Sequence, residues 1–381
     1  MTAESREFQL FVKPVGSSCN LACSYCYYLG KEKLVDGNGF GIMPEALLRN
    51  YIRQHIEATT DDTISFSWHG GEPLLAGMDF YRQVLKIQAE YNPDGKKLVN
   101  GIQTNGTLIN NEWSRFFREN DFMVGISMDG PGEMHDIHRR TRQGSTSFSD
   151  VMRGFATLKE NGIIPEILCV VNSANVKYPQ LLYDMFLGME VNYITFIPLV
   201  ERDMSSPSGV SARTVGADEF GYFLCTVFDL WIENGIGNVK IQVFEEAART
   251  AFGQDHTLCI FKRECGMVPV IAHNGDFYSC DHYVDAAHRL GNIKENSLSF
   301  FLDSTKQHEF GQLKYSSLPC YCLKCEVLPM CNGECPKNRF LKSRDNESGL
   351  NYLCNGYKHF FKHCTPFIQA IADVWRAQPN T

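Results

Sequence analysis

Short apolar runs alternate with amphipathic stretches from Phe8 to about Val200. The runs are rich in Val, Ile and Phe and end near Gly, Asn or Asp, which is typical of β-strands. We therefore predict six strands, at Phe8–Val12, Thr63–Trp68, Leu98–Gln103, Phe122–Ser127, Glu166–Val171 and Tyr193–Ile197. The stretches between them repeat apolar residues with helical spacing. They predict helices at Pro44–Ile56, Asp79–Glu90, Glu112–Asn120, Phe148–Asn161 and Tyr178–Met189.

Six successive β-α units indicate an α/β fold with parallel strands and right-handed crossovers. Periodicity leaves a doubly wound sheet and a partial barrel open as alternatives. In either architecture the chemistry lies at the carboxyl ends of the strands. Further along, the pattern predicts a connector with helices at Ala217–Glu233 and Ile241–Phe252, and a final helix at Cys364–Ala377.

The composition describes a globular protein with ample core. The 381 residues are 44% hydrophobic and 21% charged, which suits one large domain and a smaller one. The net charge of -8 argues against a nucleic-acid-binding protein, because such proteins carry a basic face. No apolar stretch is long enough for a membrane span, and residues 1–10 show no secretory signal. We expect a cytoplasmic location.

Fifteen cysteines are the unusual feature of the composition. Three lie between residues 19 and 26, and nine more lie between residues 259 and 354. In a reducing compartment, clustered cysteines indicate metal ligation rather than disulfides. The spacing of the cysteines therefore says more about their role as metal ligands than their number does.

The first cluster, Cys19, Cys23 and Cys26, forms a C-x3-C-x2-C run just after the first predicted strand. Three thiolates can hold three irons of a four-iron cluster and leave the fourth iron open to a small molecule. The alternatives are a zinc site or three unrelated core thiols. Structural zinc sites usually take four protein ligands, and no fourth Cys or His follows at a suitable spacing.

Polar residues follow three further predicted strands where each strand ends. The three segments are His69–Pro73, Gln103–Thr107 and Ser127–Pro131. Adjacent glycines, as at Gly70 and Gly71, let the backbone approach a ligand closely. Each segment alone is also compatible with simple turn chemistry. Their common position at strand ends favours the rim of one active site.

The cysteine run and the strand-end segments together resemble the radical S-adenosylmethionine enzymes. The resemblance implies a partial (β/α)6 barrel, similar to a TIM barrel, over residues 1–235, including the connector. It implies that Cys19, Cys23 and Cys26 ligate the reducing cluster. The residues that it implies around S-adenosylmethionine are Tyr25, Gly70, Gly71, Glu72, Gln103, Asn105, Ser127, Asp129 and Arg139. Arg140 and Arg142 are alternatives to Arg139, and a solvated charged face is the simpler interpretation of that arginine run.

The cysteines after residue 236 resemble those of the SPASM domain, which carries two auxiliary [4Fe–4S] clusters. The resemblance implies a small cysteine-rich domain over residues 236–381. One implied ligand set is Cys259, Cys265, Cys280 and Cys335, and the other is Cys322, Cys325, Cys331 and Cys354. Two zinc ribbons are the alternative, because C-x2-C pairs serve both metals. Cys320 is left unassigned, and Cys169 is expected to be a core thiol.

The stretch Cys280-Asp281-His282-Tyr283-Val284 makes the resemblance more specific. It is similar to the anaerobic sulfatase-maturating enzymes, which oxidise a Cys or Ser of a sulfatase to Cα-formylglycine. This implies S-adenosylmethionine and three [4Fe–4S] clusters as cofactors and Asp281 as general base, with His282 a weaker candidate. It implies a substrate with a Cys/Ser-x-Pro/Ala-x-Arg motif, a flavodoxin or ferredoxin as reductant, and Tyr28 along the substrate channel. We expect a monomer.

Two other functions are compatible with parts of the pattern. One is a different SPASM peptide maturase that forms a thioether, a carbon–carbon crosslink or an epimer. Such enzymes often carry an N-terminal peptide-recognition domain, and we expect none because only residues 1–7 precede the first strand. The other is a non-enzymatic iron–sulfur carrier or zinc module, which the three-cysteine run and the strand-end segments disfavour.

Overall fold

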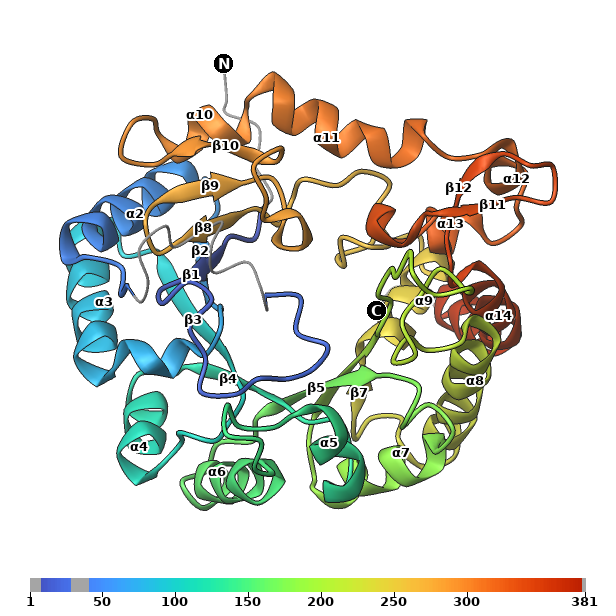
Figure 1. Ribbon diagram of the computed structural model, residues 1–381, viewed down its shortest axis with the longest axis horizontal. Coiled ribbons are helices and arrows are strands. Elements are labelled where there is room, and N and C mark those ends of the chain that lie inside the picture. Colours follow the sequence, from blue (N-terminus) through green and yellow to red (C-terminus); the bar gives the residue numbers. More distant parts are fainter. Residues whose placement is uncertain (1–7, 29–40, 379–381) are drawn as a thin grey trace. The chain divides into compact units, whose positions relative to one another are not determined.

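The computed structural model describes residues 8–28 and 41–378 (Figure 1). The short N-terminal lead at residues 1–7 lies outside them. The chain divides into two compact units. The first unit comprises residues 1–127, 138–165 and 266–311, and the second comprises residues 128–137, 166–265 and 312–381. Among the described residues, no helix combines the length and apolar character needed to cross a membrane.

The sheet of the first unit is built around β1 (Phe11–Lys13), which is parallel to a neighbour on each side. One side continues in parallel through β2 (Thr63–Trp68), β3 (Lys97–Thr104) and β4 (Met123–Ser127). The other side holds β8 (Val270–Ala272), extended by antiparallel β9 (Asp276–Tyr278) and β10 (Arg289–Asn292). The segment around residue 280 therefore belongs to the same sheet system as the cysteine run after β1.

Aromatic side chains fill the core between this sheet and its helices. Trp68 is fully buried, contacts Tyr51 and Tyr81 edge-on, and donates from its indole nitrogen to Asn100 Oδ1 at 3.0 Å. Asn100 also exchanges two hydrogen bonds with the buried Gln88. The helical elements of this unit are α2 (Glu45–Ala58), η1 (Pro73–Ala76), α3 (Met78–Tyr91), α4 (Asn111–Glu119), α6 (Phe148–Glu160), η2 (Asp281–Tyr283) and α10 (Leu298–Leu302).

The second unit contains three parallel strands and a group of packed helices. Its strands are β5 (Glu166–Val171), β6 (Tyr193–Pro198) and β7 (Lys240–Ile241). Its helices are α7 (Pro179–Gly188), α8 (Ala217–Asn234), α9 (Gln242–Ala251), α12 (Cys320–Leu323), α13 (Leu328–Cys331), η3 (Pro336–Asn338) and α14 (Cys354–Ala377). A small hairpin joins β11 (Leu341–Lys342) to β12 (Ser348–Leu350). Helices α5 (Gly132–His138) and α11 (Thr305–Ser316) include residues of both units.

Helices α8 and α14 cross at two glycines. A Cβ on Gly221 would lie 2.6 Å from the Cα of Gly356, so neither position has room for a side chain. This close approach fixes α14, which begins at the predicted cluster ligand Cys354. The second unit thus anchors Cys354, a predicted cluster ligand, through a backbone contact between helices.

The structure reproduces the predicted strands and the helices between them to within a few residues. The final helix is a correction, because it begins at Cys354 rather than Cys364. Its buried face runs without a break through Tyr357, Phe360 and Phe361 to Ile368, and Pro366 lies inside the helix instead of near its start. The predicted domain boundary after residue 235 stays a prediction.

Candidate active site and cluster-binding cysteines

Hydrogen bonds to a distant segment hold the loop of the first three cysteines in place. Ala22 N donates to Arg140 O at 2.8 Å, and Ser24 N donates to His138 O at 2.9 Å. Within the loop, Cys26 N donates to Cys23 O at 2.9 Å. The loop thus has a fixed backbone on the first unit, directly after β1.

The Cys19 sulfur is surrounded by donors. It accepts hydrogen bonds from Leu21 N at 3.3 Å and from Asn105 Nδ2 at 3.7 Å. Burial and then the charge of Glu72 raise the pKa of the Cys19 thiol to about 12, and Cys23 and Cys26 add to the effect. Ionisation of this group therefore needs nearby positive charge, which coordinated iron supplies. The donor set fits a cluster ligand.

The cysteines of the first loop do not converge on the position of a single ion. No three His, Cys, Asp or Glu side chains in residues 8–28 and 41–378 come together around one ion. In a four-iron cluster each cysteine ligates a different iron atom, so its ligands need not surround one ion.

The two adjacent glycines after β2 approach the cysteine loop closely. Gly71 N donates to Gly16 O at 3.0 Å, and the next amide, Glu72 N, donates to Ser18 O at 2.8 Å. A Cβ on Gly71 would lie 2.0 Å from Ser18 O, so a side chain there would displace the backbone just before Cys19. The structure therefore explains the adjacent glycines by contact between two loops.

Glu72 joins the ends of β2 and β3. Its carboxylate is fully buried and accepts from Leu74 N at 3.0 Å, Thr104 Oγ1 at 2.7 Å and Asn105 N at 2.8 Å. Burial raises the pKa of Glu72, and these hydrogen bonds oppose the rise. Asn105 passes the connection on, since its Nδ2 donates to Asn20 Oδ1 at 2.9 Å. Two strand-end segments and the cysteine loop thus form one polar network.

Other residues predicted around S-adenosylmethionine also pair with one another. Gln103 Nε2 donates to Ser127 Oγ at 3.1 Å, across the position where Gly125 leaves space for the Gln103 side chain. Arg139 Nη1 donates to the Tyr25 hydroxyl at 3.0 Å, and both residues are buried. Their contacts with S-adenosylmethionine stay a prediction.

Asp129 belongs to the second unit and has structural contacts there. Its Oδ1 accepts from Val170 N at 3.0 Å, and its backbone oxygen accepts from Asn175 Nδ2 at 3.0 Å. The buried carboxylate therefore ties the segment after β4 to the end of β5. A role for Asp129 in binding S-adenosylmethionine stays a prediction.

Asp281 is held by three donors that come from the first strand and the cysteine loop. Lys13 Nζ lies 2.6 Å from Oδ1, Tyr28 donates to the same oxygen at 2.9 Å, and Tyr27 donates to Oδ2 at 2.5 Å. Burial acts to raise the pKa of Asp281, but the charges of Lys13 and His282 and the donated hydrogen bonds hold it well below its usual range. The side chain is therefore a carboxylate, able to accept a proton.

His69 lies at the end of β2 in the same unit. Its ring stacks on Phe11 with centroids 3.9 Å apart, and its backbone amide donates to Val12 O at 2.8 Å. Burial, and then the charge of Lys13, lower the pKa of His69 to about 3. The imidazole is therefore neutral at the strand ends.

The four cysteines predicted to hold the second auxiliary cluster interact with one another in the second unit. Burial and then Cys354 raise the pKa of Cys322 to about 11 and that of Cys331 to about 12. Burial and then Cys325 raise the pKa of Cys354. These side chains are close enough to feel each other's charge. Their assignment as cluster ligands stays a prediction.

The other predicted set is divided between the units. Cys259, Cys265 and Cys335 belong to the second unit, and Cys280 belongs to the first. Cys335 begins a turn that Asn338 N closes with a 3.0 Å hydrogen bond to Cys335 O. The assignment of this set also stays a prediction.

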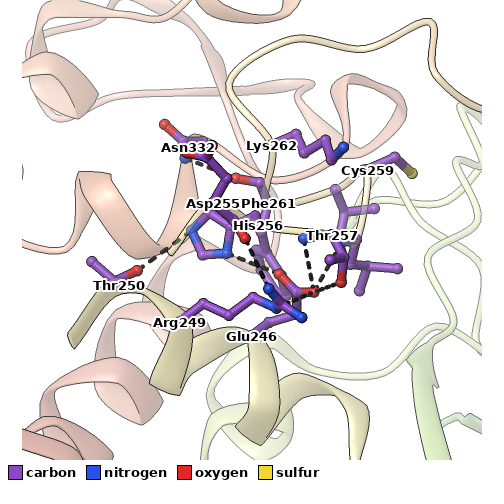
Figure 2. A network of polar contacts seen from close by, with 12 residues as sticks. Glu246, Arg249, Thr250, Asp255, His256, Thr257, Cys259, Phe261, Lys262 and Asn332 are labelled. Atoms are coloured by element: carbon purple, nitrogen blue, oxygen red, sulfur yellow. Dashed lines mark hydrogen bonds and ion pairs between the residues drawn. The ribbon is translucent and has the colours of Figure 1, made fainter. Parts of the chain in front are cut away.

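A buried carboxylate on α9 organises the loop that leads into Cys259 (Figure 2). Glu246 Oε1 accepts from Thr257 N at 3.1 Å and from Leu258 N at 2.9 Å, and Oε2 pairs with His256 Nδ1 at 2.9 Å. Burial would raise the pKa of Glu246, but the hydrogen bonds from His256 and Thr257 hold it below its usual value. His256 Nε2 lies 3.0 Å from Pro329 O. The network therefore links the loop that carries Cys259 to α13, which ends at Cys331.

The sequence interpretation missed Lys13 and Tyr27, two of the three residues that hold Asp281. A charged residue at the carboxyl end of a buried strand is a usable signal for Lys13. Tyr27 has no such signal beyond its place next to Cys26. Both contacts depend on pairing of β1 with β8, which the spacing of apolar residues does not predict.

Comparisons with known proteins agree with this geometry. Residues 14–177 match the model of the Radical SAM superfamily, and residues 259–326 match that of SPASM, an iron-sulfur cluster-binding domain. A serine-type anaerobic sulfatase-maturating enzyme of Bacteroides thetaiotaomicron is 41% identical, with 98% of this chain and 95% of the relative covered. A cysteine-type anaerobic sulfatase-maturating enzyme of Clostridium perfringens is 32% identical, with 96% and 98% covered.

Among solved structures, native anSMEcpe with bound AdoMet and Cp18Cys peptide is 32% identical, with a TM-score of 0.86 over 96% of this chain and 99% of that one. This match confirms the predicted α/β fold class, a radical S-adenosylmethionine domain followed by a SPASM domain. It also rules out the non-enzymatic carrier. The chain therefore belongs to the family of anaerobic sulfatase-maturating enzymes.

Proposed function

We propose that this radical S-adenosylmethionine enzyme oxidises a Cys or Ser side chain of a sulfatase polypeptide to Cα-formylglycine, with Asp281 as the base. The observation that carries the proposal is the Asp281 carboxylate, held by Lys13, Tyr27 and Tyr28 in the same unit as the Cys19 loop. The serine-type and cysteine-type relatives support the choice of reaction.

The proposed cofactors are S-adenosylmethionine and three [4Fe–4S] clusters. When bound, S-adenosylmethionine and the reducing cluster supply a 5′-deoxyadenosyl radical that removes hydrogen from the substrate Cβ, and the auxiliary clusters supply an electron acceptor. Cys19, Cys23 and Cys26 would hold the reducing cluster. The network of Glu72, Asn105 and the adjacent glycines fixes the loops around that site.

Asp281 would take the proton that the substrate thiol or hydroxyl loses during oxidation. The carboxylate is mostly buried, which limits competition from water for this proton. Its depressed pKa keeps it ionised at neutral pH but makes it a weak base in the absence of substrate. Substrate binding that loosens the contact with Lys13 would strengthen the base.

We also propose a substrate with a Cys/Ser-x-Pro/Ala-x-Arg motif, a flavodoxin or ferredoxin as reductant, and action in the cytoplasm. The substrate class rests on the serine-type and cysteine-type relatives and on the Cp18Cys peptide in the solved structure. The location rests on the fifteen cysteines, which need a reducing compartment to remain available for iron.

Incubation of the anaerobically reconstituted enzyme with matched Cys- and Ser-containing sulfatase peptides tests the function. We expect mass spectrometry to show an aldehyde at the Cys or Ser position of at least one peptide, with 5′-deoxyadenosine formed alongside. Formation of 5′-deoxyadenosine with a thioether or carbon–carbon crosslink in the peptide, and no aldehyde, would instead identify the other type of SPASM maturase.

The pH dependence of Lys13→Met tests the role of the ion pair. The charge of Lys13 holds the pKa of Asp281 down, so removing it lets burial raise that pKa. A base must be deprotonated to act, so the rate should fall with decreasing pH through the raised pKa. We expect an acid limb below roughly pH 6 in Lys13→Met, which the wild type lacks.

The measurement is the initial rate of formylglycine formation from pH 5.5 to 8.5, divided by the rate of 5′-deoxyadenosine formation. Lys97→Met is the matched control, because Lys97 is exposed at the amino end of β3 in the same unit. Superimposable profiles for wild type and an active Lys13→Met would show that Lys13 does not set the basicity of Asp281.

A further inference from the structure

Lys314, on α11, is a buried lysine whose ammonium group faces backbone carbonyls. The residue is 1% exposed, and Nζ donates to Cys259 O and Ile260 O, each at 2.8 Å, and to Lys262 O. An ammonium has three N–H donors and a neutral amine has two. Three carbonyl acceptors therefore require the charged form.

The segment that Lys314 binds is the one that carries Cys259. Asn332 Nδ2 donates to the remaining carbonyl of this segment, Phe261 O, at 2.7 Å (Figure 2). Every backbone oxygen from residue 259 to 262 thus accepts a hydrogen bond from a side chain. The Lys314 charge is therefore fixed beside this cysteine.

No carboxylate in residues 8–28 and 41–378 forms an ion pair with Lys314. A second cation, Arg339, donates to Gly333 O at 2.8 Å and also to Lys314 O, and the buried carboxylate of Glu334 offsets its charge. Burying a charge that is hydrogen-bonded but has no opposite charge in an ion pair with it is still costly. The site therefore calls for a compensating negative group.

The candidate ligand Cys259 lies directly against Lys314, because Nζ donates to its backbone oxygen at 2.8 Å, whereas the buried carboxylate of Glu334 acts on Arg339. Burial lowers the pKa of Lys314, whereas the charges of Cys265, Cys259 and Cys335 raise it. These are three of the four residues assigned to the first auxiliary cluster. Four thiolates outnumber the positive charge of a [4Fe–4S] core, so such a cluster is an anion and becomes more negative on reduction.

We propose that Lys314 is the fixed countercharge of the first auxiliary cluster and raises its reduction potential. The proposal rests on the proposed function, because it takes Cys259, Cys265 and Cys335 as cluster ligands. A nearby cation stabilises the reduced cluster more than the oxidised one, since the reduced cluster carries the larger negative charge. By raising the reduction potential, Lys314 makes the first auxiliary cluster a better electron acceptor.

The test compares Lys314→Gln with Lys314→Arg in full-length protein whose Cys19, Cys23 and Cys26 are all replaced by Ala. This background removes the reducing cluster and should retain about eight irons. A background protein without iron would overturn the cluster assignment itself, separately from the role of Lys314. Lys342→Gln is the matched control, because Lys342 is an exposed lysine of the same unit.

The readout is a redox titration followed by electron paramagnetic resonance. In Lys314→Gln we expect the reduction potential of one of the two clusters to fall by about 59 mV. This is about a tenfold change in the one-electron equilibrium in favour of the oxidised cluster. Lys314→Arg should keep the original potential, and Lys342→Gln should shift neither step. Loss of one cluster in Lys314→Gln but not in Lys314→Arg would likewise support the countercharge. Unchanged potentials with both clusters present, or equal loss of a cluster in both variants, would overturn it.

Discussion

Asp281→Asn should cleave S-adenosylmethionine at a near-normal rate and yield at least about 100-fold less formylglycine. The amide cannot take the proton that the substrate thiol or hydroxyl must lose, while the hydrogen bonds of the Cys19 sulfur with Leu21 and Asn105 keep their partners. Asparagine has nearly the same shape, and its oxygen can still accept from Tyr28. The effect therefore falls on proton transfer rather than on the shape of the site. The measurement is the ratio of formylglycine to 5′-deoxyadenosine by mass spectrometry.

Asp285→Asn is the matched control for this substitution. Asp285 lies four residues further along the same segment, and its half-exposed carboxylate pairs with His288 at 2.8 Å. We expect its product ratio to equal that of the wild type. A normal formylglycine yield in Asp281→Asn would show that another group takes the proton. A loss of 5′-deoxyadenosine together with formylglycine would show instead that Asp281 acts by supporting the cysteine loop.

The local part of this site could be predicted from the sequence because it follows strand ends. Gln103, Asn105 and Ser127 each end a parallel strand or directly follow one, and such ends meet at one edge of a sheet. The structure brings them into hydrogen-bonding distance of one another or of the cysteine loop. The spacing of apolar residues was sufficient to predict this proximity, because strands that follow one another in the chain are also neighbours in the sheet.

The long-range part could not be predicted in this way. Lys13 meets Asp281 because β1 pairs in parallel with β8, a strand of three residues that follows some 260 residues later. A strand this short has too few positions for an alternating pattern to be recognised. Asp281 itself was identified from the family resemblance, whereas its partner Lys13 emerged only from the fold.

The same limit applies to the charge around the auxiliary cysteines. Lys314 lies on a helix whose pattern resembles that of any solvated surface helix, and its burial results from contacts with the Cys259 segment. Cysteine spacing identifies candidate ligands, because ligands recur in short motifs. The groups that compensate their charge come from other elements and carry no motif. Sequence reasoning therefore identifies the metal-binding residues more readily than the residues that tune the metal.

Cys23→Ala should abolish turnover altogether, because it removes one of three side chains that the reducing cluster requires. We expect the variant to hold about eight irons where the wild type holds about twelve, and to form no 5′-deoxyadenosine above background. Cys169→Ala is the matched control, since Cys169 is fully buried in β5 and belongs to none of the three predicted ligand sets. It should keep its iron and its activity.

Iron content and 5′-deoxyadenosine together make this experiment decisive. The two neighbours of Cys23, Ala22 and Ser24, donate backbone hydrogen bonds to residues 138–140. The substitution therefore removes a ligand without releasing the loop. Lost activity with unchanged iron would mean that the three cysteines do not hold a cluster. Lost iron in both Cys23→Ala and Cys169→Ala would point to general unfolding instead. Loss confined to Cys23→Ala would establish the loop after β1 as the site where the reaction begins.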